Sequence, residues 1–353
     1  MLRTQTLLVR PTDPEPEIIA RAAAIVRSGG LVAFPTETVY GLGADALNEE
    51  AVARIFAAKG RPVYDPLIVH IFSPAELPRV ARAVPETAHR LAERFWPGPL
   101  TLVLPRAPAV PTIVTAGLDT VAVRCPDHPV ALALIASSGT PIAAPSANRF
   151  GRTSPTTAQH VLDDLNGRVE LILDAGPTPI GVESTVLDLT GPTPTILRPG
   201  GTPREALEAE LGPVAVRGEQ VPLSEAGMPS PGLLSRHYAP RAELRLFVGP
   251  TEAALRAMRA DAEEHIAAHR RVGILVADED AAAFADLDVI GETVGPADNL
   301  NIVAQRLFGA LRALDAQGVD LILARDFSAH GLGTAVRDRL RRAADVTVIA
   351  AAE

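Results

Sequence analysis

Polar residues that could do chemistry stand where short apolar runs of the chain end. Four such transitions are Leu31–Phe34 into Pro35-Thr-Glu-Thr-Val-Tyr40, Thr120–Val123 into Arg124, Ile142–Ala144 into Pro145-Ser-Ala-Asn148, and Ile196-Leu197 into Arg198-Pro-Gly200. In α/β sheets, ligands bind where strands end. The pattern therefore predicts that these segments meet in one ligand site although they lie far apart in the sequence.

Several cationic side chains beside these runs begin close to the expected core, namely Lys59, Arg61, Arg124 and Arg198. Burying an unpaired cation is costly, whereas a triphosphate would offer charge-assisted hydrogen bonds of about 1.5–3 kcal/mol each. Gly/Pro-rich turns nearby would add further donors from Ser146, Asn148, Ser154 and Ser184. The residues alone therefore favour nucleotide binding without a Walker phosphate loop, a motif that the sequence lacks.

Lys59 is the only lysine among 33 lysine and arginine residues. A coding bias toward arginine explains that composition in general. An ammonium is a compact point charge and a guanidinium is a bulky planar fork, so a site that needs the former would retain its lysine. Both explanations of Lys59 remain open at this stage.

Other residues of these segments also have structural explanations. His70 on an apolar strand could be a satisfied core histidine, and Cys125 beside Arg124 could be a buried structural thiol rather than a reactive one. Thr36, Glu37 and Thr38 could simply form a turn, Ser146 and Asn148 a turn or helix cap, and Arg124 and Arg198 could pair with surface carboxylates.

A near-match to the dinucleotide fingerprint occurs at Gly41-Leu-Gly43. That motif should follow a strand directly and open a helix, whereas this copy lies behind Pro35–Tyr40 and ahead of an expected helix cap at Asn48. Dinucleotide binding is therefore disfavoured.

Composition excludes several classes of protein. The chain has 353 residues, of which 47% are hydrophobic, and a formal charge of −9. It is too apolar for a disordered protein, has no apolar run of about 18–20 residues to span a membrane, and lacks a general basic surface for nucleic acid. A single cysteine, Cys125, excludes an intrachain disulfide and a multi-cysteine metal site, and Met1–Glu17 has no secretory apolar stretch. We expect a cytoplasmic location and no membrane contact.

The elements that must position these residues suggest two α/β domains. Short strands and helices alternate over residues 15–203, which we expect to form a domain with a mixed sheet. Residues 204–242 read as a linker or lid, since 218–240 are rich in Pro, Gly and Ser. Regular β-α alternation over 243–353 predicts a smaller domain with a parallel, Rossmann-like sheet.

Together these segments resemble the threonylcarbamoyl-AMP synthase family, in its two-domain form with an N-terminal YrdC-like domain. The resemblance covers the whole chain and rests on ordered motifs: Pro35-Thr-Glu-Thr-Val-Tyr-Gly-Leu-Gly43, Lys59-Gly-Arg-Pro62 with Pro66-Leu-Ile-Val-His70, Trp96-Pro-Gly-Pro-Leu-Thr101, Val121-Ala-Val-Arg124, Ala144-Pro-Ser-Ala-Asn148 with Ser154-Pro-Thr156, Glu183-Ser-Thr-Val186, Leu197-Arg-Pro-Gly200, and Ser230-Pro-Gly232 with His237-Tyr-Ala-Pro240. Asp65 departs from the pattern, where an amide is expected.

The resemblance implies a mixed, twisted N-terminal sheet with a large concave cavity. It also implies a nucleotidyltransferase that converts L-threonine, bicarbonate and ATP to threonylcarbamoyl-AMP and pyrophosphate, for the threonylcarbamoyl (t6A) modification of tRNA. Lys59 and Arg61 would be catalytic. ATP would bind Lys59, Arg61, Asp65, Thr120, Ser146, Asn148, Ser154, Arg198, His237 and Tyr238, and threonine would bind Thr38, His70, Arg124, Ala144 and Ser184.

The same resemblance predicts that no metal is held by the protein itself and that Mg²⁺ arrives on the ATP phosphates. It predicts a downstream threonylcarbamoyl-transferase machinery as partner and at most a weak tRNA contact. Three rival functions remain: an RNA-binding module, an enzyme that takes carbamoyl phosphate as donor, and a regulatory protein whose C-terminal domain senses a ligand.

Overall fold

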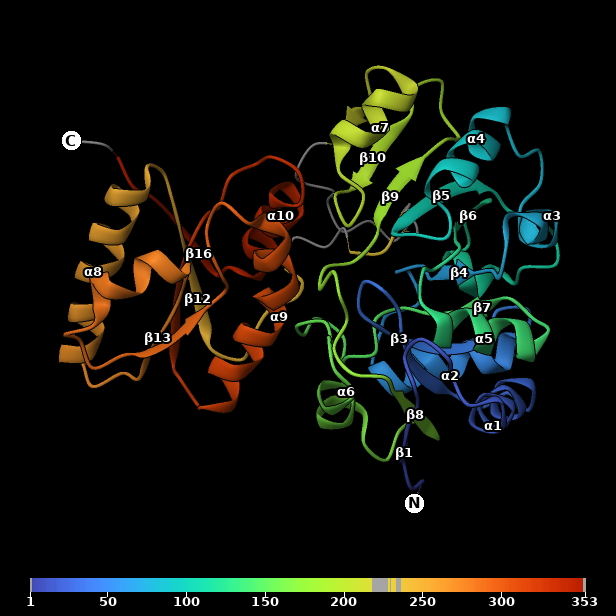
Figure 1. Cartoon of the computed structure of the whole chain (residues 1–353), viewed down its shortest axis with the longest axis horizontal. Coiled ribbons are helices and arrows are strands. Elements are labelled where there is room, and N and C mark those ends of the chain that lie inside the picture. The colour runs from blue at the N-terminus through green and yellow to red at the C-terminus, as the bar shows by residue number, and fades with distance from the viewer. Residues whose placement is uncertain (1, 218–227, 229, 233–235, 352–353) are drawn as a thin grey trace. The chain divides into compact units, whose positions relative to one another are not determined.

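The structure is a computed structural model that describes residues 2–217, 228, 230–232 and 236–351 (Figure 1). The chain divides into two compact units. The first comprises residues 1–150, 154–179 and 183–233, and the second comprises residues 151–153, 180–182 and 234–353. The second unit therefore includes two short pieces from within the predicted domain at 15–203. Within the predicted linker at 204–242, residues 218–227, 229 and 233–235 lie outside the described residues.

Unit 1 contains a mixed sheet of 11 strands in the order β1-β8-β2-β3-β7-β4-β6-β5-β9-β10-β11. The strands are β1 Gln5–Leu8, β2 Val32–Pro35, β3 Tyr40–Asp45, β4 Ile68–His70, β5 Leu100–Pro105, β6 Thr120–Arg124, β7 Ile142–Ala143, β8 Leu171–Asp174, β9 Thr185–Asp188, β10 Thr195–Arg198 and β11 Ala215–Val216. Parallel pairs such as β4 with β6 stand beside antiparallel pairs such as β5 with β6. The predicted mixed α/β domain is confirmed.

The side chains of residues 31–34, in β2 and just before it, alternate between the two faces of this sheet, and both faces are covered. Leu31 and Ala33 pack into one apolar cluster, and Val32 and Phe34 pack into another. Successive strand residues point to opposite faces, so a continuous apolar run is what a strand covered on both sides requires. The helices of unit 1 are α1 Pro16–Arg27, α2 Glu49–Lys59, α3 Leu77–Val80, α4 Glu86–Phe95, α5 Pro129–Ser138, α6 Ala158–Leu165 and α7 Arg204–Leu211.

Helix α2 has clear start and stop signals. The Asn48 side chain accepts a hydrogen bond from the backbone N–H of Ala51 at 3.1 Å, and Gly60 ends the helix with φ of 66°. A left-handed residue at this position suits glycine because it has no Cβ. These caps place Lys59 at the last position of the helix.

Three strands were not predicted, one of which is the two-residue β11 that pairs in parallel with β10. β1 precedes the expected domain start at residue 15 and pairs in parallel with β8, and β3 contains Gly41 and Gly43 and pairs antiparallel with β2. A Cβ on Gly43 would lie 2.6 Å from the Phe34 ring, so this glycine allows close packing in a strand. The Gly41-Leu-Gly43 match is therefore not a phosphate-binding turn.

Unit 2 contains a five-stranded sheet in the order β14-β13-β15-β12-β16, with every recorded pairing parallel. This confirms the predicted parallel sheet. Its strands are β12 Glu243–Val248, β13 Val272–Val276, β14 Ile290–Thr293, β15 Leu321–Arg325 and β16 Val346–Ile349, and its α-helices are α8 Thr251–Ala267, α9 Leu300–Ala316 and α10 Gly333–Ala343. Among the described residues of both units, no helix is long and apolar enough to cross a membrane.

Candidate functional site

One face of the sheet in unit 1 carries polar side chains over a small apolar floor. On the other face, Val69 of β4 and Val123 of β6 pack into the main core. The alternate residues Ile68 and Ala122 form a separate cluster. Because strand side chains alternate, His70 lies on the face of Ile68 and Arg124 on the face of Ala122. His70 and Arg124 are register partners, so the fold brings together two residues 54 positions apart.

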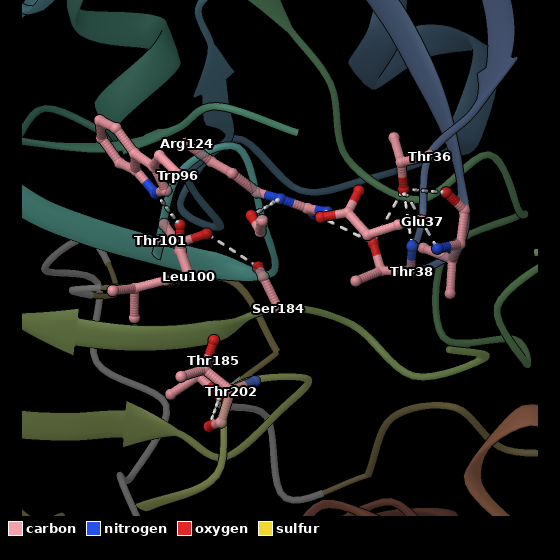
Figure 2. Close-up of polar contacts among 12 residues, drawn as sticks. Thr36, Glu37, Thr38, Trp96, Leu100, Thr101, Arg124, Ser184, Thr185 and Thr202 are labelled. Carbon is pink, nitrogen blue, oxygen red and sulfur yellow. Dashed lines mark hydrogen bonds and ion pairs between the residues drawn. The ribbon is translucent and has the colours of Figure 1, made fainter. Parts of the chain in front are cut away.

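Arg124 is buried and held by three neighbours. Its Nε donates to the Gly98 carbonyl at 3.3 Å and its Nη1 donates to the Thr38 hydroxyl at 3.0 Å. Its Nη2 lies 2.6 Å from Oε1 of Glu37. Figure 2 shows the guanidinium reaching toward Glu37 and Thr38. These contacts fix the guanidinium in the expected threonine-binding part of the site.

Ser184 connects Arg198 to Thr101. The Thr101 and Ser184 hydroxyls lie 2.8 Å apart (Figure 2), and Nη2 of Arg198 donates to the Ser184 carbonyl at 2.9 Å. The register between β9 and β10 shifts between Ile196 and Arg198. Ile196 faces the main core, whereas Arg198 is paired with Val186 of the site floor. The irregularity thus turns Arg198 onto the polar face, as β-bulges do.

Lys59 joins α2 to the turn after β7. Its ammonium donates to the carbonyl oxygens of Ser146 and Asn148, and it lies 3.3 Å from the Asn148 side-chain oxygen. The Ser146 hydroxyl donates to that same oxygen at 2.6 Å. Lys59 is 2% exposed. The ammonium thus organises the turn that carries two of the predicted ATP-binding residues.

Arg61 and Asp65 form a buried ion pair at 2.8 Å. Arg61 also donates to the carbonyl oxygens of Asp65 and Pro66. Burial raises the pKa of the Asp65 carboxyl, and the positive charges of Arg61, Lys59 and Arg198 partly offset that rise. These three cations therefore surround one carboxylate.

The premise that these cations are buried without partners is wrong. Backbone carbonyls accept hydrogen bonds from Lys59, Arg61, Arg124 and Arg198, and carboxylates pair with Arg61 and Arg124. Carbonyls satisfy donors without neutralising charge. Arg198 has no carboxylate within ion-pair distance in the part of the chain that the structure describes, so its charge remains available to an anion.

The remaining predicted residues of unit 1 occupy different positions. The Ser154 hydroxyl donates to Glu183, next to Ser184, and the Ala144 N–H donates to the Ile68 carbonyl at 2.9 Å. Thr120 begins β6, opposite Pro105, at the other end of the strand from Arg124. In the described part of the chain, Thr120 makes no hydrogen bond or ion pair with the four cations.

His70 and Cys125 are both held in uncharged forms. Burial and the nearby charge of Arg124 lower the pKa of His70 to about 3, and its Nδ1 lies 3.2 Å from the Ile68 carbonyl. Nδ1 therefore carries the hydrogen. Burial raises the pKa of the Cys125 thiol to about 12. A thiol with such a pKa is not a nucleophile at neutral pH.

His237 and Tyr238 belong to unit 2. The Tyr238 ring stacks on Phe308 at 5.8 Å, and the Arg339 guanidinium lies 4.9 Å from the Tyr238 ring centre. The backbone N–H of His237 donates to the Arg342 carbonyl. Both aromatic residues are therefore built into their own unit, and their role toward ATP stays a prediction.

Sequence reasoning missed Glu37, Gly98 and Thr101 as parts of the site. Glu37 lies in a segment predicted to reach the site but is not among the predicted site residues, yet it is 4% exposed and ion-paired with Arg124. Trp96 donates to the Leu100 carbonyl at 2.6 Å within the segment that supplies Gly98 and Thr101. The signal available was the placement of polar Thr101 inside the apolar run Leu100–Leu104.

The mixed sheet with its buried basic face defines an α/β protein suited to anionic ligands. The family model described as "Telomere recombination" matches residues 24–200, and that described as "Threonylcarbamoyl-AMP synthase, C-terminal domain" matches residues 203–345. The chain belongs to the threonylcarbamoyl-AMP synthase family, which confirms the resemblance.

Relatives match this chain over nearly its full length. The threonylcarbamoyl-AMP synthase of Pyrococcus abyssi is 50% identical over 332 residues, which cover 93% of this chain and 94% of that protein. That of Bacillus subtilis is 48% identical over 338 residues, covering 96% and 95%. The crystal structure of P. abyssi Sua5 complexed with L-threonine superposes with a TM-score of 0.92 at 46% identity, over 98% of this chain and 99% of that one.

Proposed function

We propose that this chain catalyses the synthesis of threonylcarbamoyl-AMP from L-threonine, bicarbonate and ATP, with release of pyrophosphate. The observation that carries the proposal is the convergence, within unit 1, of four buried cations from three separate segments: the end of α2, β6 and β10. Lys59 binds the turn of Ser146 and Asn148, Arg198 binds Ser184, and Arg124 lies on the same face of the sheet. The family relationship to a structure with bound L-threonine supports the same conclusion.

The triphosphate of ATP binds the basic half of the site. Lys59, Arg61 and Arg198 supply positive charge, and Ser146, Asn148 and Ser154 supply hydroxyl, amide and backbone groups. Among the described residues, no group of three or more His, Cys, Asp and Glu side chains could hold a metal ion. The donor set suits phosphate oxygens rather than a metal, so Mg²⁺ enters on the ATP phosphates and neutralises them there.

L-threonine binds beside Arg124. The guanidinium takes the substrate carboxylate in a charge-assisted contact, and Thr38, His70, Ala144 and Ser184 lie around it. Because His70 is neutral, it contributes a hydrogen-bonding nitrogen and no charge. The Thr101 hydroxyl positions Ser184 through their 2.8 Å contact.

The chemistry needs positioning rather than a protein nucleophile. Threonine first loses its ammonium proton to water. The neutral amine then attacks the carbon of bicarbonate, forming a carbamate and releasing water. A carbamate oxygen then attacks the α-phosphorus of ATP, and the bond from that phosphorus to the pyrophosphate oxygen breaks. The cations stabilise the charge that develops on the phosphates. Because the AMP group of ATP is transferred to the carbamate, the enzyme is a nucleotidyltransferase. The product serves the threonylcarbamoyl modification of tRNA, through a downstream transferase in the cytoplasm.

Pyrophosphate release by the full-length chain tests this function. The complete mixture contains ATP, Mg²⁺, L-threonine and bicarbonate, and each is omitted in turn. We expect release to require all of them, and Arg198→Ala to reduce it strongly while Arg90→Ala, at an exposed position of α4, leaves it unchanged. Release without bicarbonate, or activity only with carbamoyl phosphate, would contradict the proposal.

A further inference from the structure

Glu37 and Arg124 form a buried ion pair in which the carboxylate and one guanidinium nitrogen lack hydrogen bonds to the rest of the described chain. The side chains are 6% and 4% exposed, and Oε1 of Glu37 lies 2.6 Å from Nη2 of Arg124. Despite this distance, Nη2 and both Glu37 carboxylate oxygens lack a hydrogen-bond partner among the described residues. The two groups attract each other by charge, but the N–H bonds do not point at the oxygens.

Such an arrangement is costly in a buried site. Buried carboxylates are normally satisfied by several hydrogen bonds, and leaving oxygens without donors incurs their full desolvation penalty. The Thr36 and Thr38 hydroxyls bond to each other at 2.8 Å, and Thr36 also donates to the Val39 carbonyl. The neighbouring hydroxyls are thus engaged elsewhere. A bound ligand with a donor group would supply the hydrogen bonds that the Glu37 carboxylate lacks.

Charge balance indicates which ligand this is. Arg124 alone would favour any small carboxylate, but Glu37 already neutralises Arg124. His70 beside Arg124 is uncharged, and the pKa of the nearby Asp127 is raised by burial and by repulsion from Glu37. A ligand that brought only a carboxylate would leave one negative charge uncompensated in a buried site. A zwitterion brings an equal positive charge.

We propose that Glu37 is a specificity-determining residue that binds the ammonium group of the amino-acid substrate while Arg124 binds its carboxylate. The buried pair is thus a complement to a zwitterion and discriminates against carboxylates that lack an α-ammonium. This inference rests on the proposed function, because it concerns the threonine half of that site. It assigns a role to a residue that is not among the predicted site residues.

Binding of two ligands to the full-length chain tests the assignment. L-threonine and 3-hydroxybutanoate share the carboxylate, hydroxyl and methyl groups, and only threonine carries the ammonium. Each is titrated calorimetrically into the wild type, Glu37→Gln and Glu37→Asp, without ATP. Glu93→Gln removes one carboxylate from an exposed position of α4 and is the matched control.

We expect the wild type and Glu93→Gln to bind threonine at least about tenfold more tightly than 3-hydroxybutanoate, the size expected for a charge-assisted hydrogen bond. In Glu37→Gln, threonine affinity should fall about tenfold to a hundredfold while 3-hydroxybutanoate affinity holds or rises, so that the preference disappears. Glu37→Asp, which keeps the charge on a shorter side chain, should retain part of the preference.

Equal weakening of both ligands in Glu37→Gln would overturn the assignment, since a merely structural residue would act in that way. Should Glu37→Gln not fold, the wild type still decides, because equal affinity for the two ligands also overturns it. These failures are distinct from failure of the proposed function. That function fails when pyrophosphate release does not depend on threonine and bicarbonate, whatever the ratio of the two affinities.

Discussion

Replacing Lys59 with arginine is a sharp test of the basic half of the site because the charge is kept. The ammonium lies among the Ser146 and Asn148 carbonyls and the Asn148 side-chain oxygen, in a position that is 2% exposed. The turn around them is anchored to β3, since the Ala147 N–H donates to the Tyr40 carbonyl at 2.8 Å. A guanidinium is too large for this place without moving the turn.

The magnitude follows from two contributions. Overpacking a buried site costs about 1–3 kcal/mol of folding stability, which lowers the melting temperature by several degrees in a chain of this size. Displacing a donor that stabilises transition-state charge costs about 10²–10³-fold in kcat. We therefore expect Lys59→Arg to fold and to lose at least about a hundredfold in kcat/KM for ATP.

The assay compares initial rates of pyrophosphate release with melting curves followed by circular dichroism. Arg90→Lys makes the reverse exchange at an exposed position of α4 and should match the wild type in both. Wild-type kinetics in Lys59→Arg would refute the reasoning, and the single lysine would then reflect composition alone. A loss of activity that only parallels a loss of folded protein would refute it equally.

Three further predictions concern the neighbouring groups. Arg124→Ala should raise the KM for threonine more than about tenfold and the KM for ATP far less, because it removes a charge-assisted contact to one substrate; equal effects in steady-state kinetics would contradict the carboxylate role. Thr101→Val removes the hydroxyl that contacts Ser184 and should weaken threonine binding about threefold to tenfold in calorimetry; unchanged affinity would show that Ser184 needs no such support. The melting temperature of Asp65→Asn minus that of the wild type should become more positive as pH rises, because the raised pKa of Asp65 means that the wild type loses stability as the carboxyl titrates, whereas the amide does not titrate. Melting curves at about pH 4 and pH 8 check this, and a difference that stays constant or falls with pH would contradict it.

Local patterns were sufficient to predict most elements of the fold. The strands Thr120–Arg124, Leu321–Ala324 and Val346–Ile349 follow β-branched and aliphatic runs between turn residues, and α9 follows the Asn299 cap. β3 was not predicted because its two glycines weaken the strand pattern. They are needed for contact with Phe34, which is a tertiary requirement that no local pattern contains. β1 is likewise held by its long-range pairing with β8.

For the site, too, local patterns predicted some features, and features that depend on tertiary contacts were not predicted. The residue types beside strand ends indicated some of the contacts that the structure shows, such as that of Lys59 with Ser146 and Asn148, because strand direction and side-chain alternation are local properties. The partners of those groups were not predictable. Glu37 meets Arg124 across 87 positions of sequence, and Arg198 reaches the polar face only through the register shift between β9 and β10. Such contacts depend on the tertiary register of the sheet.

The two halves of the site differ in how their cations are held, and this difference matches the two substrates. Arg198 donates to the carbonyls of Ser184 and Pro231, which leave its charge to act on a polyanion. Arg124 is instead balanced by Glu37, so the threonine half carries little net charge. ATP carries several negative charges and threonine none overall. In the proposed complex, Asp65 offsets Arg61 among the cations of the basic half, and Arg198 remains to act on the triphosphate. Glu37 offsets the charge of Arg124, which suits a ligand without net charge.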